Sequence, residues 1–70
     1  MAQDHPIELI KIARVISLTG LSRPSVYRLA RQGDFPKPTK LGVRSSAWAL
    51  CEIEAWIRGR LAERDERVAS

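Results

Sequence analysis

A glycine, a serine and a proline at positions 20 to 24 constrain the fold of this chain more than any other feature. Gly20 follows a short stretch of helical periodicity, and only glycine adopts the positive φ of the tight turn after a helix without steric cost. Ser22 is a favourable N-cap, and Pro24 fits the first turn of the following helix, where its missing N–H removes no hydrogen bond. Residues 18–32 therefore predict two helices joined by a short turn, a helix-turn-helix.

Apolar residues at helical spacing define both helices. The first is expected over residues 12–19, and it lacks a side-chain N-cap; its inward positions are Ile12, Val15, Ile16 and Thr19. The second is expected to end at Gly33, and its inward positions are Val26, Leu29 and Ala30.

The remaining segments predict a small hairpin and a third helix. Two prolines exclude a helix from residues 34–38, where Phe35 is expected to enter the core. Residues 39–41 and 46–48 predict two short strands around a turn. A last helix is expected from Leu50 to Arg60 or beyond, with Trp48 and Trp56 in the core and no capping side chain at its start.

Seventy residues allow one small domain. We expect a flexible tail over residues 1–8, with residues 7–10 as an extended, apolar lead-in, a domain over residues 9–61, and a tail over residues 62–70 that extends the last helix but frays. The predicted fold class is mainly α with a small β-hairpin, a winged helix-turn-helix.

The positive charge is concentrated in the middle of the chain. The net charge is +4, but residues 11–44 contribute +7 and the remainder −3. Within residues 11–44 the only acidic residue is Asp34, and the basic residues are Lys11, Arg14, Arg23, Arg28, Arg31, Lys37, Lys40 and Arg44. This distribution predicts one basic surface suited to a polyanion and a mildly acidic opposite side.

Composition argues against several other classes of protein. A single cysteine and a single histidine leave no disulfide and no structural zinc site, so we expect no cofactor and no metal. Cys51 is expected to be a small buried or half-buried apolar residue, and His5 has no expected role. No catalytic set of residues is recognisable, and an enzyme is not expected. The absence of a secretory signal and of a long apolar run favours a cytoplasmic, bacterial, nucleoid-associated protein without membrane contact.

A helix-turn-helix places its second helix in the major groove of DNA, so the exposed positions of that helix are candidate contacts. Arg23 and Arg28 are expected to contact bases or phosphates, and Arg31 a phosphate. Ser25 and Tyr27 are expected to form hydrogen bonds with phosphates or bases, and the alternative for Tyr27 is to pack on the domain. Lys40 and Arg44 flank the hairpin turn and are expected to contact phosphates. The complete set of candidates is Ser22, Arg23, Ser25, Tyr27, Arg28, Arg31, Lys40 and Arg44.

Four motifs occur in a recognisable order: Leu18-Thr-Gly-Leu-Ser-Arg-x-Ser-Val-Tyr-Arg-Leu29, Gly33-x-Phe-Pro-x-Pro38, Leu41-Gly-x-Arg44 and Trp48-x-x-x-Glu-Ile-Glu-Ala-Trp-Ile57. In this order and spacing, the chain resembles the AlpA family of phage-derived regulators over about residues 9–60. The resemblance implies a winged helix-turn-helix protein related to the MerR-like and excisionase groups, which binds promoter or attachment-site DNA and controls prophage or mobile-element genes.

The sequence thus predicts a sequence-specific transcriptional regulator that reads double-stranded DNA with its second helix. Usable specificity from so small a domain requires self-association on DNA, and contact with a recombinase or RNA polymerase fits such a role. One alternative is an architectural factor of the excisionase type that bends DNA for a recombinase. A further alternative is a protein-interaction module that docks a partner on the last helix.

Overall fold

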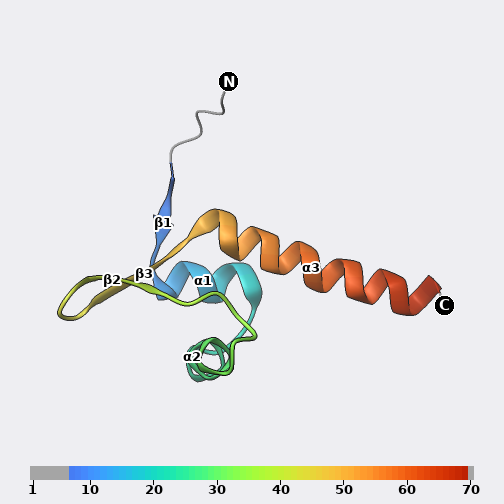
Figure 1. Cartoon of the computed structure of the whole chain (residues 1–70), viewed down its shortest axis with the longest axis horizontal. Helices are drawn as coiled ribbons and strands as arrows, with labels where there is room; N and C mark the ends of the chain where they lie inside the picture. The colour runs from blue at the N-terminus through green and yellow to red at the C-terminus, as the bar shows by residue number, and fades with distance from the viewer. Residues whose placement is uncertain (1–6, 70) are drawn as a thin grey trace.

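The fold is described by a computed structural model for residues 7–69, and the sequence segment 1–6, which includes His5, lies outside this range together with Ser70. The described elements are β1 (Leu9–Ile10), α1 (Ile12–Thr19), α2 (Arg23–Gln32), β2 (Thr39–Gly42), β3 (Ser45–Ala49) and α3 (Leu50–Ala69). The strands form one antiparallel sheet in the order β1-β3-β2. The predicted class, mainly α with a small sheet and compatible with a winged helix-turn-helix, is confirmed (Figure 1).

The turn between α1 and α2 has the predicted chemistry. Gly20 ends α1 with φ 77°, and its N–H donates to the carbonyl of Ile16 at 2.8 Å. Ser22 caps α2, because its Oγ accepts from the backbone N–H of Ser25 at 3.3 Å. Gly33 ends α2 with φ 84°. These caps fix where α2 begins and ends, and they therefore decide which of its side chains face away from the core.

A third strand joins the predicted hairpin. Leu9 pairs with Ala49 and Ile10 pairs with Trp48, so β1 occupies the edge of the sheet opposite β2. The ladder continues into α3, since the N–H of Leu50 donates to the carbonyl of Glu8 at 2.9 Å. This bond satisfies a backbone group at the start of α3 for which the sequence offers no capping side chain.

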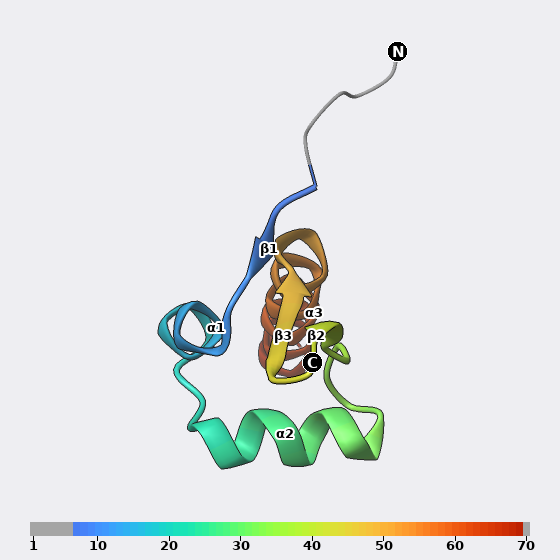
Figure 2. The same ribbon diagram turned by 90° about the vertical axis from the view of Figure 1, so that its left-hand side faces the viewer.

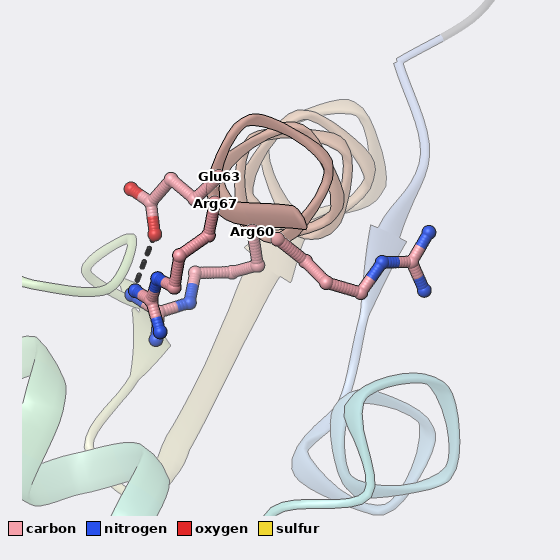
Figure 3. Close-up of a pocket in the computed structure, with 4 residues that line it drawn as sticks. Arg60, Glu63 and Arg67 are labelled. Atoms are coloured by element: carbon pink, nitrogen blue, oxygen red, sulfur yellow. Dashed lines mark ion pairs between the residues drawn. The ribbon is translucent and has the colours of Figure 1, made fainter. Parts of the chain in front are cut away.

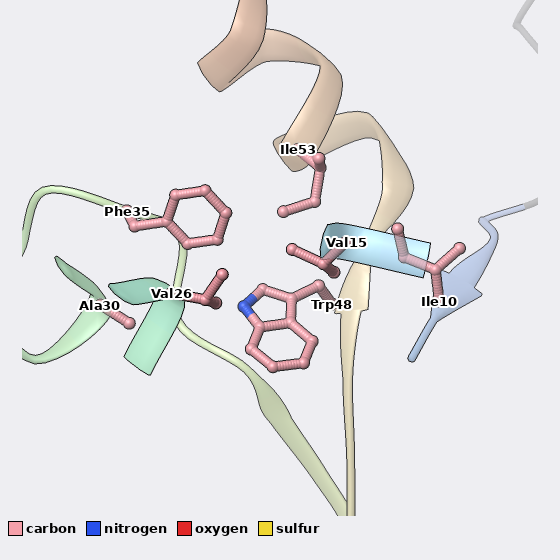
Figure 4. Close-up of a cluster of buried hydrophobic side chains, with 7 residues drawn as sticks. All are labelled: Ile10, Val15, Val26, Ala30, Phe35, Trp48 and Ile53. Atoms are coloured by element: carbon pink, nitrogen blue, oxygen red, sulfur yellow. The ribbon is translucent and has the colours of Figure 1, made fainter. Parts of the chain in front are cut away.

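The core lies where α1, α2, β3 and the first half of α3 meet (Figure 4). Its members are Ile10, Val15, Val26, Ala30, Phe35, Trp48 and Ile53. Trp48 is fully buried, and its Nε1 donates to the carbonyl of Pro36 at 3.0 Å. Trp56 is half-buried at the edge of this cluster, with its ring 4.8 Å from that of Phe35. The predicted core positions of Phe35 and Trp48 are confirmed.

The expectation for Cys51 is wrong. Its side chain is exposed on the second residue of α3. Residues two apart on a helix point in nearly opposite directions, so the burial of Ile53 turns Cys51 toward solvent.

Helix α3 continues to Ala69 and extends well past α1 and α2 (Figure 1). Its first half packs on β3, whereas Arg58 to Arg67 are all exposed. Among the described helices, none combines the length and the apolar character that a membrane crossing requires.

Candidate nucleic-acid interface

Helix α2 lies along one side of the molecule and turns a long face away from the other elements (Figure 2). Val26 and Ala30 face the core, and Arg23, Arg28 and Arg31 are exposed. All three arginines are therefore accessible to solvent. Arg28 and Arg31 lie close together on the side opposite Val26, whereas Arg23, at the N-terminal end of the helix, lies about 140° from Arg28 around the helix axis.

Three candidate residues at the N-terminal end of α2 form one hydrogen-bonded group. The Oγ of Ser25 accepts from the hydroxyl of Ser22 at 2.9 Å and from Nη2 of Arg28 at 3.4 Å. The Ser22 hydroxyl therefore makes two local hydrogen bonds: it donates to Oγ of Ser25 and accepts from the backbone N–H of Ser25, which caps the helix. Ser22 and Ser25 thus orient the start of α2 and the Arg28 side chain.

Tyr27 connects the exposed face to the core. Its half-buried ring lies 5.8 Å from the ring of Trp48 at an interplanar angle of 59°. The guanidinium carbon of Arg23 lies 6.0 Å from the centroid of the same ring, at the outer limit of a cation–π contact. Of the two alternatives for Tyr27, packing on the domain is observed, and contact with DNA stays a prediction.

The far end of α2 meets the link to the sheet. Tyr27, Arg31 and Lys37 line one surface hollow together with Ala30 and Pro38. The sequence makes Lys37, between two prolines, a weaker candidate for phosphate contact than Lys40 and Arg44. Its place beside Arg31 depends on the path of residues 33–38 after Gly33, and it puts Lys37 among the cations at this end of α2.

The hairpin carries the two remaining candidates. Lys40 lies on β2 opposite Ser46, and Arg44 lies in the turn between β2 and β3. Both are exposed, and the neighbouring Val43 is 91% exposed. Lys11 also reaches this hairpin, since its Nζ donates to Oγ of Ser45 at 3.1 Å. No pattern in the sequence indicates this contact, which links residues 34 positions apart.

The basic residues of α2 and of the hairpin are not paired with acidic side chains in the described part of the chain. The ion pair between Arg60 and Glu63 and the ion pair between Arg64 and Asp65 both lie on α3. None of the basic residues on α2 or on the hairpin has an acidic partner in the described part of the chain. The same residues contain no group of three side chains able to hold a metal ion.

Residues 8–61 match the family described as Prophage CP4-57 regulatory protein (AlpA). This match covers more than half of the chain. The chain belongs to the AlpA family. The AlpA resemblance seen in the order of the motifs is thereby confirmed, and the matched span runs from just before β1 to Leu61 of α3. The distal part of α3 lies beyond it.

Two relatives illustrate the range of the AlpA family. The chain is 42% identical over 55 residues to the uncharacterized protein ORF88 of enterobacteria phage P4, covering 79% of this chain and 62% of that protein. It is 30% identical over 66 residues to the DNA-binding transcriptional activator AlpA of Escherichia coli (strain K12), covering 86% of this chain and 94% of the activator. The chain thus spans nearly all of the activator but less than two thirds of the phage P4 protein.

Proposed function

We propose that this AlpA-family protein is a sequence-specific, DNA-binding transcriptional regulator of prophage or mobile-element genes. The observation that carries the proposal is the set of exposed arginines on α2, none with an acidic partner among the described residues, in a helix-turn-helix with a basic hairpin beside it. The name of its E. coli relative, a DNA-binding transcriptional activator, supports the same function.

In the proposed complex, α2 enters the major groove with its first turns against the base edges. Arg23 and Arg28 provide the forked donors that pair with O6 and N7 of guanine. Arg28 is already oriented by the hydroxyl of Ser25, so less side-chain freedom is lost on binding. The phenol of Tyr27 makes no hydrogen bond within the described residues and remains available to a base or phosphate.

Phosphates on either side of the groove contact the remaining cations. Arg31 and Lys37 meet one strand at the far end of α2, and Lys40 and Arg44 on the hairpin meet the backbone beside the adjoining minor groove. These contacts set the position of α2 but carry no sequence information. A single domain contacts few base pairs, so we propose that two or more copies bind adjacent sites. A recombinase or RNA polymerase is then the partner through which the bound protein acts.

The test is a comparison of affinities for a selected duplex and a scrambled duplex of equal length across a series of salt concentrations. We expect the selected duplex to bind at least about a thousandfold more tightly, with both affinities falling as salt rises. No measurable binding to either duplex at low salt contradicts the proposal and favours a protein-interaction module.

A second candidate function is DNA bending of the excisionase type, and the tip of the hairpin favours it. Val43 is 91% exposed and Leu41 is 52% exposed, between Lys40 and Arg44. Apolar side chains inserted from the minor groove unstack base pairs and bend the duplex. Gel mobility of circularly permuted duplexes separates the two roles, because a bending factor changes mobility with the position of its site and a simple reader does not.

A further inference from the structure

We propose that the distal half of α3 forms a third DNA-contacting surface, made of Arg60, Arg64 and Arg67, which binds phosphates outside the segment read by α2. This α3 arginine face deepens the proposed function and rests on it. It lies at the end of and beyond the span shared with the family, and the sequence assigned this region to the mildly acidic side of the protein.

The helical phase of α3 carries the argument. With 3.6 residues per turn, Arg60 and Arg64 fall on the same side of the helix as Ile53 and Ile57, and Arg67 falls close to it. Ile53 is fully buried against the core, so this side is the one that faces the body of the protein. The inner side of α3 is therefore apolar where it covers the core and basic where it extends past it.

The acidic residues of distal α3 lie away from the centre of its inner side. Asp65 and Glu66 fall more than a quarter-turn away from the line of Ile53, and Glu63 lies at its margin. When the charges of this part of α3 are summed along the sequence, the basic residues of one side and the acidic residues of the other nearly cancel. The folded helix separates them, which gives α3 a basic inner side and an acidic outer side.

The three arginines border one open hollow on the surface of α3, together with Glu63. Figure 3 shows Arg60 and Arg67 extending from the lower side of α3, the side on which α2 lies. In Figure 1 the hairpin and the distal half of α3 extend to opposite sides of α2. A duplex held by α2 therefore has the hairpin on one flank and the α3 arginine face on the other.

The ion pairs of Arg60 and Arg64 do not compete strongly with phosphate. The Arg60–Glu63 pair, at 3.4 Å, has side chains 63% and 57% exposed, and the Arg64–Asp65 pair, at 2.9 Å, has side chains 65% and 67% exposed. Exposed pairs of this kind contribute little and are screened by salt. Arg60 also lies 5.6 Å from the ring centroid of Trp56, which holds its stem in place without neutralising it.

The experiment measures the salt dependence of affinity for a selected duplex with long flanks. Arg60→Gln, Arg64→Gln and Arg67→Gln are compared with Arg58→Gln, which lies on the opposite side of the same helix. Glutamine keeps a similar helix propensity, and circular dichroism checks the fold. We expect each inner variant to lower the slope of log affinity against log salt by about 0.9, and the triple variant to lose affinity by on the order of tenfold or more. Arg58→Gln is expected to leave both unchanged.

Two further comparisons sharpen the test. Glu63→Gln removes the acid beside Arg60 and is expected to tighten binding, whereas Glu66→Gln removes the same charge from the outer side and is not. Shortening the duplex on one flank is expected to abolish the difference between the wild type and the triple variant, because the phosphates that α3 contacts are then missing.

If the triple variant keeps the affinity and the salt slope of the wild type while Arg28→Ala still loses affinity, the proposal for the α3 arginine face is wrong. The proposed function is then unaffected. Absence of DNA binding by the wild type overturns both. Unchanged DNA binding in the triple variant, together with loss of binding to an acidic protein, also overturns the proposal and assigns the face to a protein partner.

Discussion

The indole nitrogen of Trp56 donates a hydrogen bond to the backbone carbonyl of Asp34 at 2.7 Å, which ties α3 to the link that follows α2. Trp48 binds the same link two residues later, through the carbonyl of Pro36 at 3.0 Å. Residues 33–38 leave α2 and lead to the hairpin, so the two indoles fix both groups of basic residues relative to each other. The sequence predicts that both tryptophans lie in the core, but no pattern in it indicates that their indole N–H groups bind the link.

Replacing either tryptophan by phenylalanine separates packing from hydrogen bonding. Trp48→Phe leaves a cavity at a fully buried position and deprives the part-buried carbonyl of Pro36 of its donor, and we expect a loss of about 3 kcal/mol in the free energy of unfolding. Trp56 is only half-buried, so Trp56→Phe is expected to cost about 1 kcal/mol. Urea denaturation measures both. A larger loss for Trp56→Phe contradicts this ranking.

Alanine at two glycines is expected to act in opposite directions. Gly20 has φ 77°, a conformation that costs an L-residue about 1–2 kcal/mol, so Gly20→Ala destabilises the protein. Gly59 is helical and an added Cβ meets no atom within 4 Å, so Gly59→Ala is expected to add about 0.5–1 kcal/mol. Thermal denaturation measures the change in melting temperature of each variant. Equal changes for the two variants would contradict the strain expected at the positive φ of Gly20.

Substitutions at Ser22 distinguish the cap from the DNA contact. Ser22→Ala removes the acceptor for the N–H of Ser25 and is expected to cost about 1 kcal/mol of stability. Ser22→Asp keeps an acceptor and places a negative charge at the helix N-terminus, so stability is retained. The same charge repels phosphate, and we expect weaker DNA binding from a protein that is equally stable. Wild-type affinity in Ser22→Asp would place this end of α2 away from the duplex.

The division of roles on the basic face is testable by specificity. Arg23→Ala and Arg28→Ala are expected to relax discrimination between the selected duplex and its single-base variants by about 1–3 kcal/mol. Lys40→Ala, on the hairpin, is expected to weaken all duplexes about equally and to reduce the salt slope by about 1. Equal effects of all three variants on every duplex would refute the division.

The turn and the core were predictable because each depends on local chemistry. Gly20, Ser22 and Gly33 have conformations or capping bonds that few other residue types provide. The burial of Val15 and Val26 follows from helical spacing within single segments.

The remaining features depend on contacts between distant segments. Strand β1 has two residues and is defined only by its pairing with β3. The distal half of α3 has no continuous apolar stripe, so its sequence resembles that of a solvated tail, and its charge pattern becomes meaningful only when the burial of Ile53 fixes the phase of the helix. Lys37 joins Arg31 only through the path of the link.

Selection of bound sequences from a pool of random duplexes tests the central claim most directly. The account predicts enrichment of a short motif by the wild-type protein, and a degraded motif when the selection is repeated with Arg28→Ala. A pool that remains random after repeated rounds at low salt would contradict the account of α2 as a helix that reads DNA sequence.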